Sequence, residues 1–98
     1  QDNQVITLGD KEFVALSTPG HSPGSLSFYN EKNNLVISGD ALFKGSIGRT
    51  DLYKGDLEQL INAIQTRLFT LKDETVVYCG HGDETTIGLE KLHNPYFQ

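Results

Sequence analysis

Short blocks of apolar residues in the first forty positions predict β-strands. Val5 to Leu8 and Phe13 to Leu16 flank a Gly9-Asp10-Lys11 turn, and together they predict a hairpin. A third strand begins at Leu26. The continuous apolar run from Leu35 to Ile37 indicates a strand that is buried on both faces.

The second half of the chain combines helical and strand patterns. Asp56 is a good N-cap with Gln59 three residues on, and a helix is predicted over 56–70. Its apolar positions follow helical spacing: Leu57, Leu60, Ile61, Ile64, Leu68 and Leu71. Val76 to Tyr78 predicts a short strand, and Thr85 to His93 predicts a last short helix.

Two stretches rich in glycine or proline, 18–24 and 44–55, predict loops. The long helix is expected to cover one face of a sheet. The run from Leu35 to Ile37 also requires apolar cover on the other face of the sheet. The rest of the 98 residues offers little to provide it.

Composition narrows the function classes. Ninety-eight residues are enough for one domain, and the net charge is −5 without a basic block, which argues against a nucleic-acid partner. No apolar run approaches the roughly 20 residues of a membrane span. The single cysteine, Cys79, excludes an internal disulfide and predicts a reducing, cytoplasmic location.

Three polar residues follow predicted strands or lie between them, each beside glycine: His21, Asp40 and His81. Two imidazoles and a carboxylate are normal ligands for zinc, iron or manganese. Taken singly, a histidine of this kind is more often an ordinary loop residue, and a strand followed by Gly-Asp is as often a plain turn. The three residues are 19 and 41 positions apart, so they form no local motif.

The order of the motifs resembles the metallo-β-lactamase superfamily, and within it the glyoxalase II-like hydrolases. The resemblance is carried by Thr-Pro-Gly-His-Ser-Pro-Gly at 18–24, Ser-Gly-Asp at 38–40, Gly-Ser-Ile-Gly-Arg-Thr-Asp-Leu at 45–52, Gly-His-Gly at 80–82 and Thr-Thr-Ile-Gly at 85–88. It implies an α/β fold that is half of a four-layer αββα sandwich, with one mixed sheet and helices on its outer face. Residues 1–98 would form the C-terminal half, and the family's His-x-His-x-Asp-His motif, absent from them, would lie before residue 1.

The resemblance also assigns roles. His21 and His81 would each complete the ligand set of one metal, and Asp40 would bridge the two and be catalytic. A hydroxide between the metals, most often zinc, with iron or manganese as alternatives, would attack a thioester carbonyl. Arg49 and Asp51 are interpreted as a structural pair near Asp40, rather than as solvated side chains.

These implications lead to one functional hypothesis with two rivals. The intact protein would be a metallo-hydrolase of the hydroxyacylglutathione hydrolase type, acting on a small-molecule thioester, whereas the 98-residue chain alone would be inactive. The rivals are a non-catalytic half-domain that folds by association and a sulfur dioxygenase with a single iron. Because one sheet face lacks cover, the chain is also expected to form a homodimer through that face.

Overall fold

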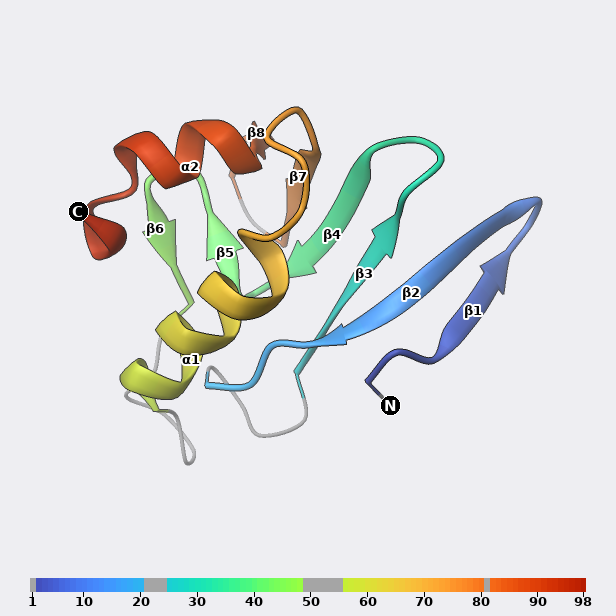
Figure 1. The fold of residues 1–98 in the computed structure, drawn as a ribbon, viewed down its shortest axis with the longest axis horizontal. Helices are drawn as coiled ribbons and strands as arrows, with labels where there is room; N and C mark the ends of the chain where they lie inside the picture. The colour runs from blue at the N-terminus through green and yellow to red at the C-terminus, as the bar shows by residue number, and fades with distance from the viewer. Residues whose placement is uncertain (1, 21–24, 49–55, 81) are drawn as a thin grey trace.

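A six-stranded mixed sheet forms the body of the molecule (Figure 1). The computed structural model describes residues 2–20, 25–48, 56–80 and 82–98. In chain order the elements are β1 (Val5–Leu8), β2 (Lys11–Ser17), β3 (Leu26–Asn30), β4 (Leu35–Gly39), β5 (Leu42–Phe43), β6 (Ser46–Ile47), α1 (Leu57–Ala63), the π-helix η1 (Ile64–Leu68), β7 (Val76–Cys79), β8 (Thr85–Thr86), α2 (Ile87–His93) and the 3₁₀-helix η2 (Pro95–Phe97).

The strand order in the sheet is β1-β2-β3-β4-β7-β8, and β5 pairs only with β6. β4 and β7 are parallel, and every other neighbouring pair is antiparallel. Because β2 and β4 both run antiparallel to β3, the strands β2, β4 and β7 all run in the same direction. Their carboxyl ends therefore lie at one edge of the sheet.

The helices cover one face of this sheet, which confirms the predicted mixed sheet with helices on its outer face. Leu60, Ile64 and Leu68 belong to a buried cluster that also contains one apolar residue from each of three strands: Leu16, Val36 and Val77. Figure 1 shows α1 in front of the sheet, while the β1–β2 hairpin extends away from the helices. Alternation along each strand turns the neighbouring side chains to the opposite face.

The predicted long helix begins at its expected cap, where Asp56 accepts a hydrogen bond from the Gln59 backbone N–H at 3.0 Å. It does not stay α-helical to residue 70, because η1 replaces its second half. The Phe69 N–H bonds to the Ile64 carbonyl at 2.8 Å, five residues back, and the Thr66 hydroxyl donates to the Asn62 carbonyl at 2.8 Å. A π-helical turn changes the spacing of the backbone hydrogen bonds but leaves the apolar stripe of the helix almost intact. The spacing of apolar residues in the sequence therefore gave no sign of η1.

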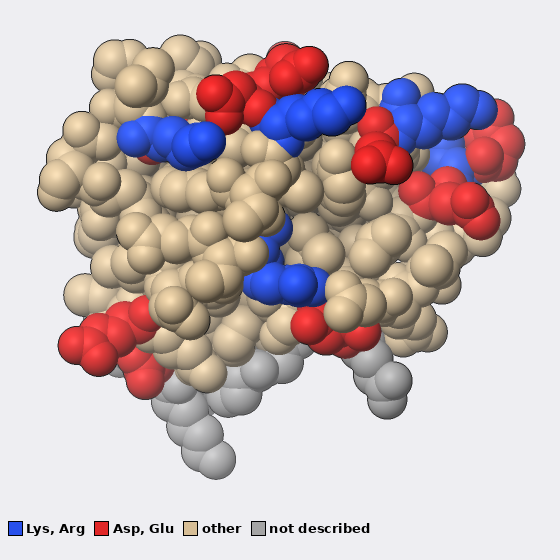
Figure 2. All heavy atoms as spheres, in the orientation of Figure 1, with Lys and Arg blue, Asp and Glu red and all other residues tan. Residues whose placement is uncertain are grey.

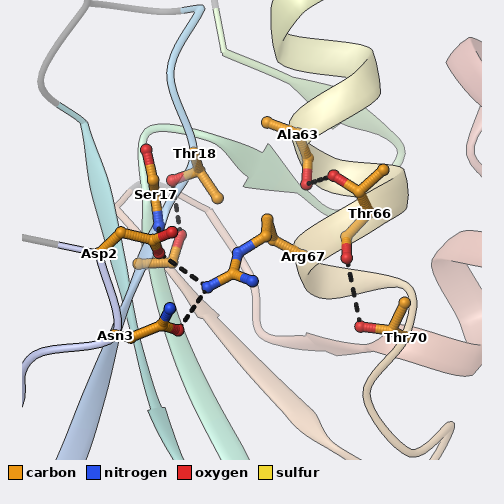
Figure 3. Close-up of polar contacts among 9 residues, drawn as sticks. Asp2, Asn3, Ser17, Thr18, Ala63, Thr66, Arg67 and Thr70 are labelled. Carbon is orange, nitrogen blue, oxygen red and sulfur yellow. Dashed lines mark hydrogen bonds and ion pairs between the residues drawn. The ribbon is translucent and has the colours of Figure 1, made fainter.

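Arg67 in η1 holds the start of the chain against the helix (Figure 3). Its Nη2 lies 2.7 Å from Asp2 Oδ1 and 2.8 Å from Asn3 Oδ1. Asp2 Oδ1 also accepts the Ser17 backbone N–H at 2.8 Å. This N–H, with the Arg67 charge, lowers the pKa of Asp2. The edge strand β1 thus begins at a fixed point beside the end of β2.

Three other predictions of local structure were wrong in part. The helix predicted over Thr85 to His93 begins only at Ile87, because Thr85–Thr86 is the strand β8, which pairs with β7. Part of the expected 44–55 loop, Ser46–Ile47, is the strand β6, because Leu42 and Ile47 are opposite each other in the β5–β6 hairpin and both are buried. The run 35–37 is not buried on both faces: Val36 is fully buried, but Ile37 remains 37% exposed on the face without helices.

Charged side chains of both signs gather along the top of the view in Figure 2, and a basic group lies near its middle, above an acidic one. Lys91 Nζ, for example, pairs with Asp73 at 2.9 Å. No helix within the described ranges is long and apolar enough to cross a membrane.

Candidate metal site

The three predicted ligands follow strands whose carboxyl ends share one edge of the sheet. His21 comes after β2, Asp40 directly after β4, and His81 one residue after β7. β4 and β7 are paired neighbours, so the chain leaves the sheet side by side at Asp40 and Gly80. Loop residues at such an edge are where a rigid sheet commonly presents functional groups.

Asp40 occupies a tight turn that its own sequence requires. The Ala41 N–H bonds to the Ser38 carbonyl at 3.0 Å, which closes a four-residue turn with Gly39 and Asp40 at its centre. Gly39 has a φ of +54°, a conformation that glycine adopts without strain. The buried Ser38 hydroxyl donates to the Leu42 carbonyl at 2.8 Å. The turn presents Asp40 as an exposed side chain on a fixed backbone.

Gly80 leaves the space that the Asp40 carboxylate uses. The Gly80 N–H bonds to the Gly39 carbonyl at 2.7 Å, which ties the end of β7 to the Asp40 turn. A Cβ on residue 80 would lie 2.8 Å from Asp40 Oδ1 and 2.9 Å from the Gly39 oxygen. The residue before His81 therefore has no room for a side chain because Asp40 lies against it.

The chain that leads to His21 is fixed against α1. Gly20 is buried, has a φ of +132°, and its carbonyl accepts the Asp56 N–H at 2.7 Å. A Cβ there would lie only 2.3 Å from the Cβ of Leu60. Close to β2, the Thr18 and Ser27 hydroxyls form a buried 3.0 Å hydrogen bond. The position of the backbone before His21 is thus set by the first turn of the helix.

His21, His81, Arg49 and Asp51 lie outside the described residues, so their predicted roles remain predictions. Within the part of the chain that the structure describes, no group of three or more His, Cys, Asp and Glu side chains is placed to hold a metal. The described neighbours nevertheless fit a metal site. Asp40 is a carboxylate in a pre-formed turn, and its Oδ1 lies where a side chain at residue 80 would otherwise be.

Cys79 ends β7 as a half-buried residue. Burial raises the pKa of its thiol, while the Lys44 backbone N–H and the Ser38 hydroxyl oppose that rise. A thiol with a raised pKa is a poorer source of thiolate, the form that binds metals. Cys79 is therefore better suited to packing beneath the site than to serving as a ligand.

A buried polar network that the sequence pattern did not indicate fixes the segment after Asp40. Glu90 is 3% exposed, and its carboxyl oxygens accept from the Gly45 N–H at 2.8 Å, the Thr85 hydroxyl at 2.7 Å and the Asn94 amide at 3.0 Å. The same Asn94 amide donates to the Ser46 carbonyl at 3.0 Å. The only available signal was the four-residue spacing of Glu90 and Asn94 on α2, because Gly45 and Ser46 are distant in sequence.

We expect the Glu90→Ala variant to lose about 3 kcal/mol or more of its free energy of unfolding, because it leaves buried donors without an acceptor. In Glu90→Gln, one oxygen still accepts and the Thr85 hydroxyl can turn to accept from the new amide, so the loss should be small. Urea unfolding followed by circular dichroism at one fixed protein concentration measures both. Equal losses in the two variants would contradict this account of the network.

A separate hollow lies at the opposite edge of the sheet. It has a volume of about 520 Å³ and is lined by the turns around Asp10 to Glu12 and Glu31 to Asn33, with Val14 and Tyr29 at its base. Burial raises the pKa of Tyr29, and Glu31 and Glu74 add to the rise. The hollow lies at the starts of β2 and β4, whereas Asp40 follows the carboxyl end of β4. The hollow is therefore not part of the candidate metal site.

Comparison with known proteins agrees with this geometry. Residues 1–81 match the family model of the metallo-beta-lactamase superfamily. The hydroxyacylglutathione hydrolase GloC of Haemophilus influenzae is 43% identical over 96 residues, which cover 98% of this chain and 45% of that protein. The structure of the BLEG-1 B3 metallo-beta-lactamase is 45% identical with a TM-score of 0.94, over 100% of this chain and 47% of that one.

A second similar structure, TTHA1623, was solved in a di-iron-bound form; it is 42% identical with a TM-score of 0.88, over 98% of this chain and 46% of that one. The chain thus spans about half the length of the relatives it matches, consistent with half of a sandwich. These similar proteins are thus a hydrolase, a metallo-beta-lactamase and a protein solved with two irons bound. With its family motifs, its sheet and the edge that carries Asp40, the chain belongs to the metallo-β-lactamase superfamily.

Proposed function

We propose that this chain supplies three ligands, His21, Asp40 and His81, to a two-metal site in a thioester hydrolase. The observation that carries the proposal is the shared edge: the carboxyl ends of β2, β4 and β7 lie together, and the Asp40 turn is bonded directly to Gly80. The ligands that come from separate parts of the sequence therefore begin from neighbouring points of one rigid sheet.

Asp40 is suited to the bridging position because a carboxylate can offer one oxygen to each of two cations. The turn fixes the backbone of Asp40, and the absence of a side chain at Gly80 lets Asp40 Oδ1 lie against the end of β7. A metal pair bound there would lower the pKa of a water molecule toward neutrality and polarise a carbonyl group. Zinc is the proposed metal, and the di-iron form of TTHA1623 makes iron the first alternative.

The proposed substrate is a hydroxyacylglutathione-like thioester, supported by the 43% identity to GloC. The single cysteine supports a reducing, cytoplasmic setting for this reaction. The His-x-His-x-Asp-His motif is absent from the 98 residues, so neither metal would have its full ligand set from this chain alone. We therefore propose that the 98-residue chain by itself is inactive.

Two proteins test this proposal together. The first is the 98-residue chain, and the second is a chimera in which these residues replace the matching segment of Haemophilus influenzae GloC. Each is loaded with zinc, iron or manganese and assayed for hydrolysis of a hydroxyacylglutathione thioester, and its metal content is measured. The chain alone should match buffer containing the same metal, whereas the chimera should bind metal and hydrolyse the thioester.

The other outcomes distinguish the rival functions. A chimera that folds but binds no metal would support a non-catalytic half-domain. One that binds a single iron and consumes oxygen with a sulfur substrate would support a dioxygenase. A β-lactam substrate belongs in the same assay because the BLEG-1 enzyme is structurally so similar. Thioester turnover by the chain alone would refute the proposal that it supplies only part of the site.

A further inference from the structure

One buried carboxyl group bonds to both segments that leave the edge of the sheet carrying Asp40. Glu90 Oε1 accepts the Gly45 N–H at 2.8 Å, and Gly45 lies five residues after Asp40. The other oxygen, Oε2, accepts the Thr85 hydroxyl at 2.7 Å, and Thr85 lies four residues after His81. Glu90 therefore joins the segment that follows Asp40 to the segment that follows His81, with one oxygen for each.

The same two segments are also joined on the other side of the proposed ligands. The Gly80 N–H donates to the Gly39 carbonyl at 2.7 Å. Asp40 directly follows Gly39 in the sequence, and His81 directly follows Gly80. Each proposed ligand thus comes, in chain order, after this backbone hydrogen bond and before a hydrogen bond to Glu90.

Asn94 adds a second contact on the Asp40 side of the network. Its amide donates to Glu90 Oε1 and to the Ser46 carbonyl, both at 3.0 Å, and Figure 1 shows α2 beside the β5–β6 hairpin that these bonds hold. Glu90 and Asn94 are both almost fully buried. An apolar side chain could fill the same space, but directed hydrogen bonds also fix how two backbone segments lie relative to each other.

We propose that Glu90 is a positioning residue for the metal site, which sets the spacing between the backbone of Asp40 and the backbone of His81. The inference rests on the proposed function, since it takes both residues as metal ligands. Ligand atoms must lie within about 0.2 Å of their usual distances from a metal, so two ligands on separate segments require a fixed spacing between those segments. Glu90 is not itself a ligand and acts only through the segments that it joins.

Three variants of the GloC chimera alter the network to different degrees. Glu90→Ala removes the hydrogen bonds to both segments. Glu90→Gln keeps them, because its amide oxygen still accepts and the Thr85 hydroxyl can accept from the new amide. Thr85→Val preserves the branched shape at residue 85 and releases only the segment that follows His81.

Leu68→Ala is the control for lost stability. Leu68 is fully buried in the core that α1 and η1 form with the sheet. It lies eight residues after Leu60, the α1 residue that contacts Gly20, and so is roughly 10 Å farther from the Asp40 edge along the helix. This variant should destabilise the chimera without disturbing either segment.

Amide hydrogen exchange followed by mass spectrometry, with no metal added, is the first measurement. Relative to β2, exchange in residues 41–48 and 82–86 should become at least about tenfold faster in Glu90→Ala, because the lost bonds no longer hold these segments closed. Thr85→Val should have this effect only in 82–86, Glu90→Gln should change neither segment, and Leu68→Ala should favour neither. If Glu90→Ala does not fold, Thr85→Val tests the same claim for one segment.

Zinc affinity, measured by competition with a chromogenic chelator, is the second measurement. It should fall at least about tenfold in Glu90→Ala and stay close to the parent value in Glu90→Gln and Leu68→Ala. Unchanged exchange or unchanged zinc affinity in Glu90→Ala, or an equal loss of zinc affinity in Leu68→Ala, would overturn the inference. A parent chimera that binds no zinc would instead contradict the proposed function, and the exchange pattern alone would then decide whether Glu90 joins the two segments.

Discussion

Gly20→Ala should remove a large part of the stability of this fold. The new Cβ would lie 2.3 Å from the Leu60 Cβ and 2.5 Å and 2.6 Å from the Leu60 Cα and N, so a side-chain movement cannot relieve the contact. The φ of +132° adds backbone strain for any residue with a Cβ. Overpacking and strain together predict a loss of about 3–6 kcal/mol, in a domain expected to have only about 5–15 kcal/mol.

Gly9→Ala is the control for this prediction. Gly9 also has a positive φ, +65°, but a Cβ there would meet nothing within 4 Å. Its expected cost is only the conformational one, about 1–2 kcal/mol. Urea unfolding of both variants at one protein concentration separates the two causes. If Gly20→Ala proves no less stable than Gly9→Ala, then the backbone at Gly20 does not pack tightly against Leu60 of α1.

In the chimera with GloC, Asp40→Asn should reduce thioester hydrolysis by at least about 100-fold, since even outer-shell partners of metal ligands cost about 10- to 100-fold when replaced. Asparagine preserves the size of the side chain and its place in the turn but not its negative charge. The bound metal should fall together with kcat/KM, which elemental analysis of the purified chimera measures. Stability should change little, because Asp40 is exposed.

Asp10→Asn provides the comparison, since Asp10 is equally exposed but lies in the β1–β2 turn at the opposite edge of the sheet. It should keep both the metal and the activity of the parent chimera. An Asp40→Asn chimera with full metal content and parental turnover would exclude Asp40 as a ligand. Of the three proposed ligands, only His21 and His81 would then remain to be tested.

The strands and the start of the long helix were predictable because their signals are local. The alternating or continuous apolar runs at 5–8, 13–16 and 35–37 each became part of a strand, and Asp56 became the N-cap of α1. The β5–β6 hairpin was missed because a two-residue strand contains no repeat from which a period can be recognised. Its buried pair, Leu42 and Ile47, is visible only once the hairpin has closed.

The candidate site was likewise predictable from the sequence only in part. Asp40 was a candidate because it follows an apolar strand and a glycine, and the structure places it in a tight turn directly after β4. The Glu90 network could not be predicted, because its partner Gly45 lies 45 residues away and donates through its backbone. Backbone donors have no sequence signature, so a buried glutamate on a short helix reads as an ordinary surface residue until the fold is known.

The parallel pairing of β4 with β7 has a consequence for the order in which the molecule assembles. β1 to β4 form a meander whose contacts are close in sequence, whereas Leu35 and Val76 must meet across an intervening stretch that contains both α1 and η1. Closing a loop of this length costs about 3 kcal/mol of chain entropy before any contact between the two strands repays it. Asp40 and Gly80 come together only through that closure, so the meander can form early, while the edge that carries Asp40 is completed among the last steps of folding.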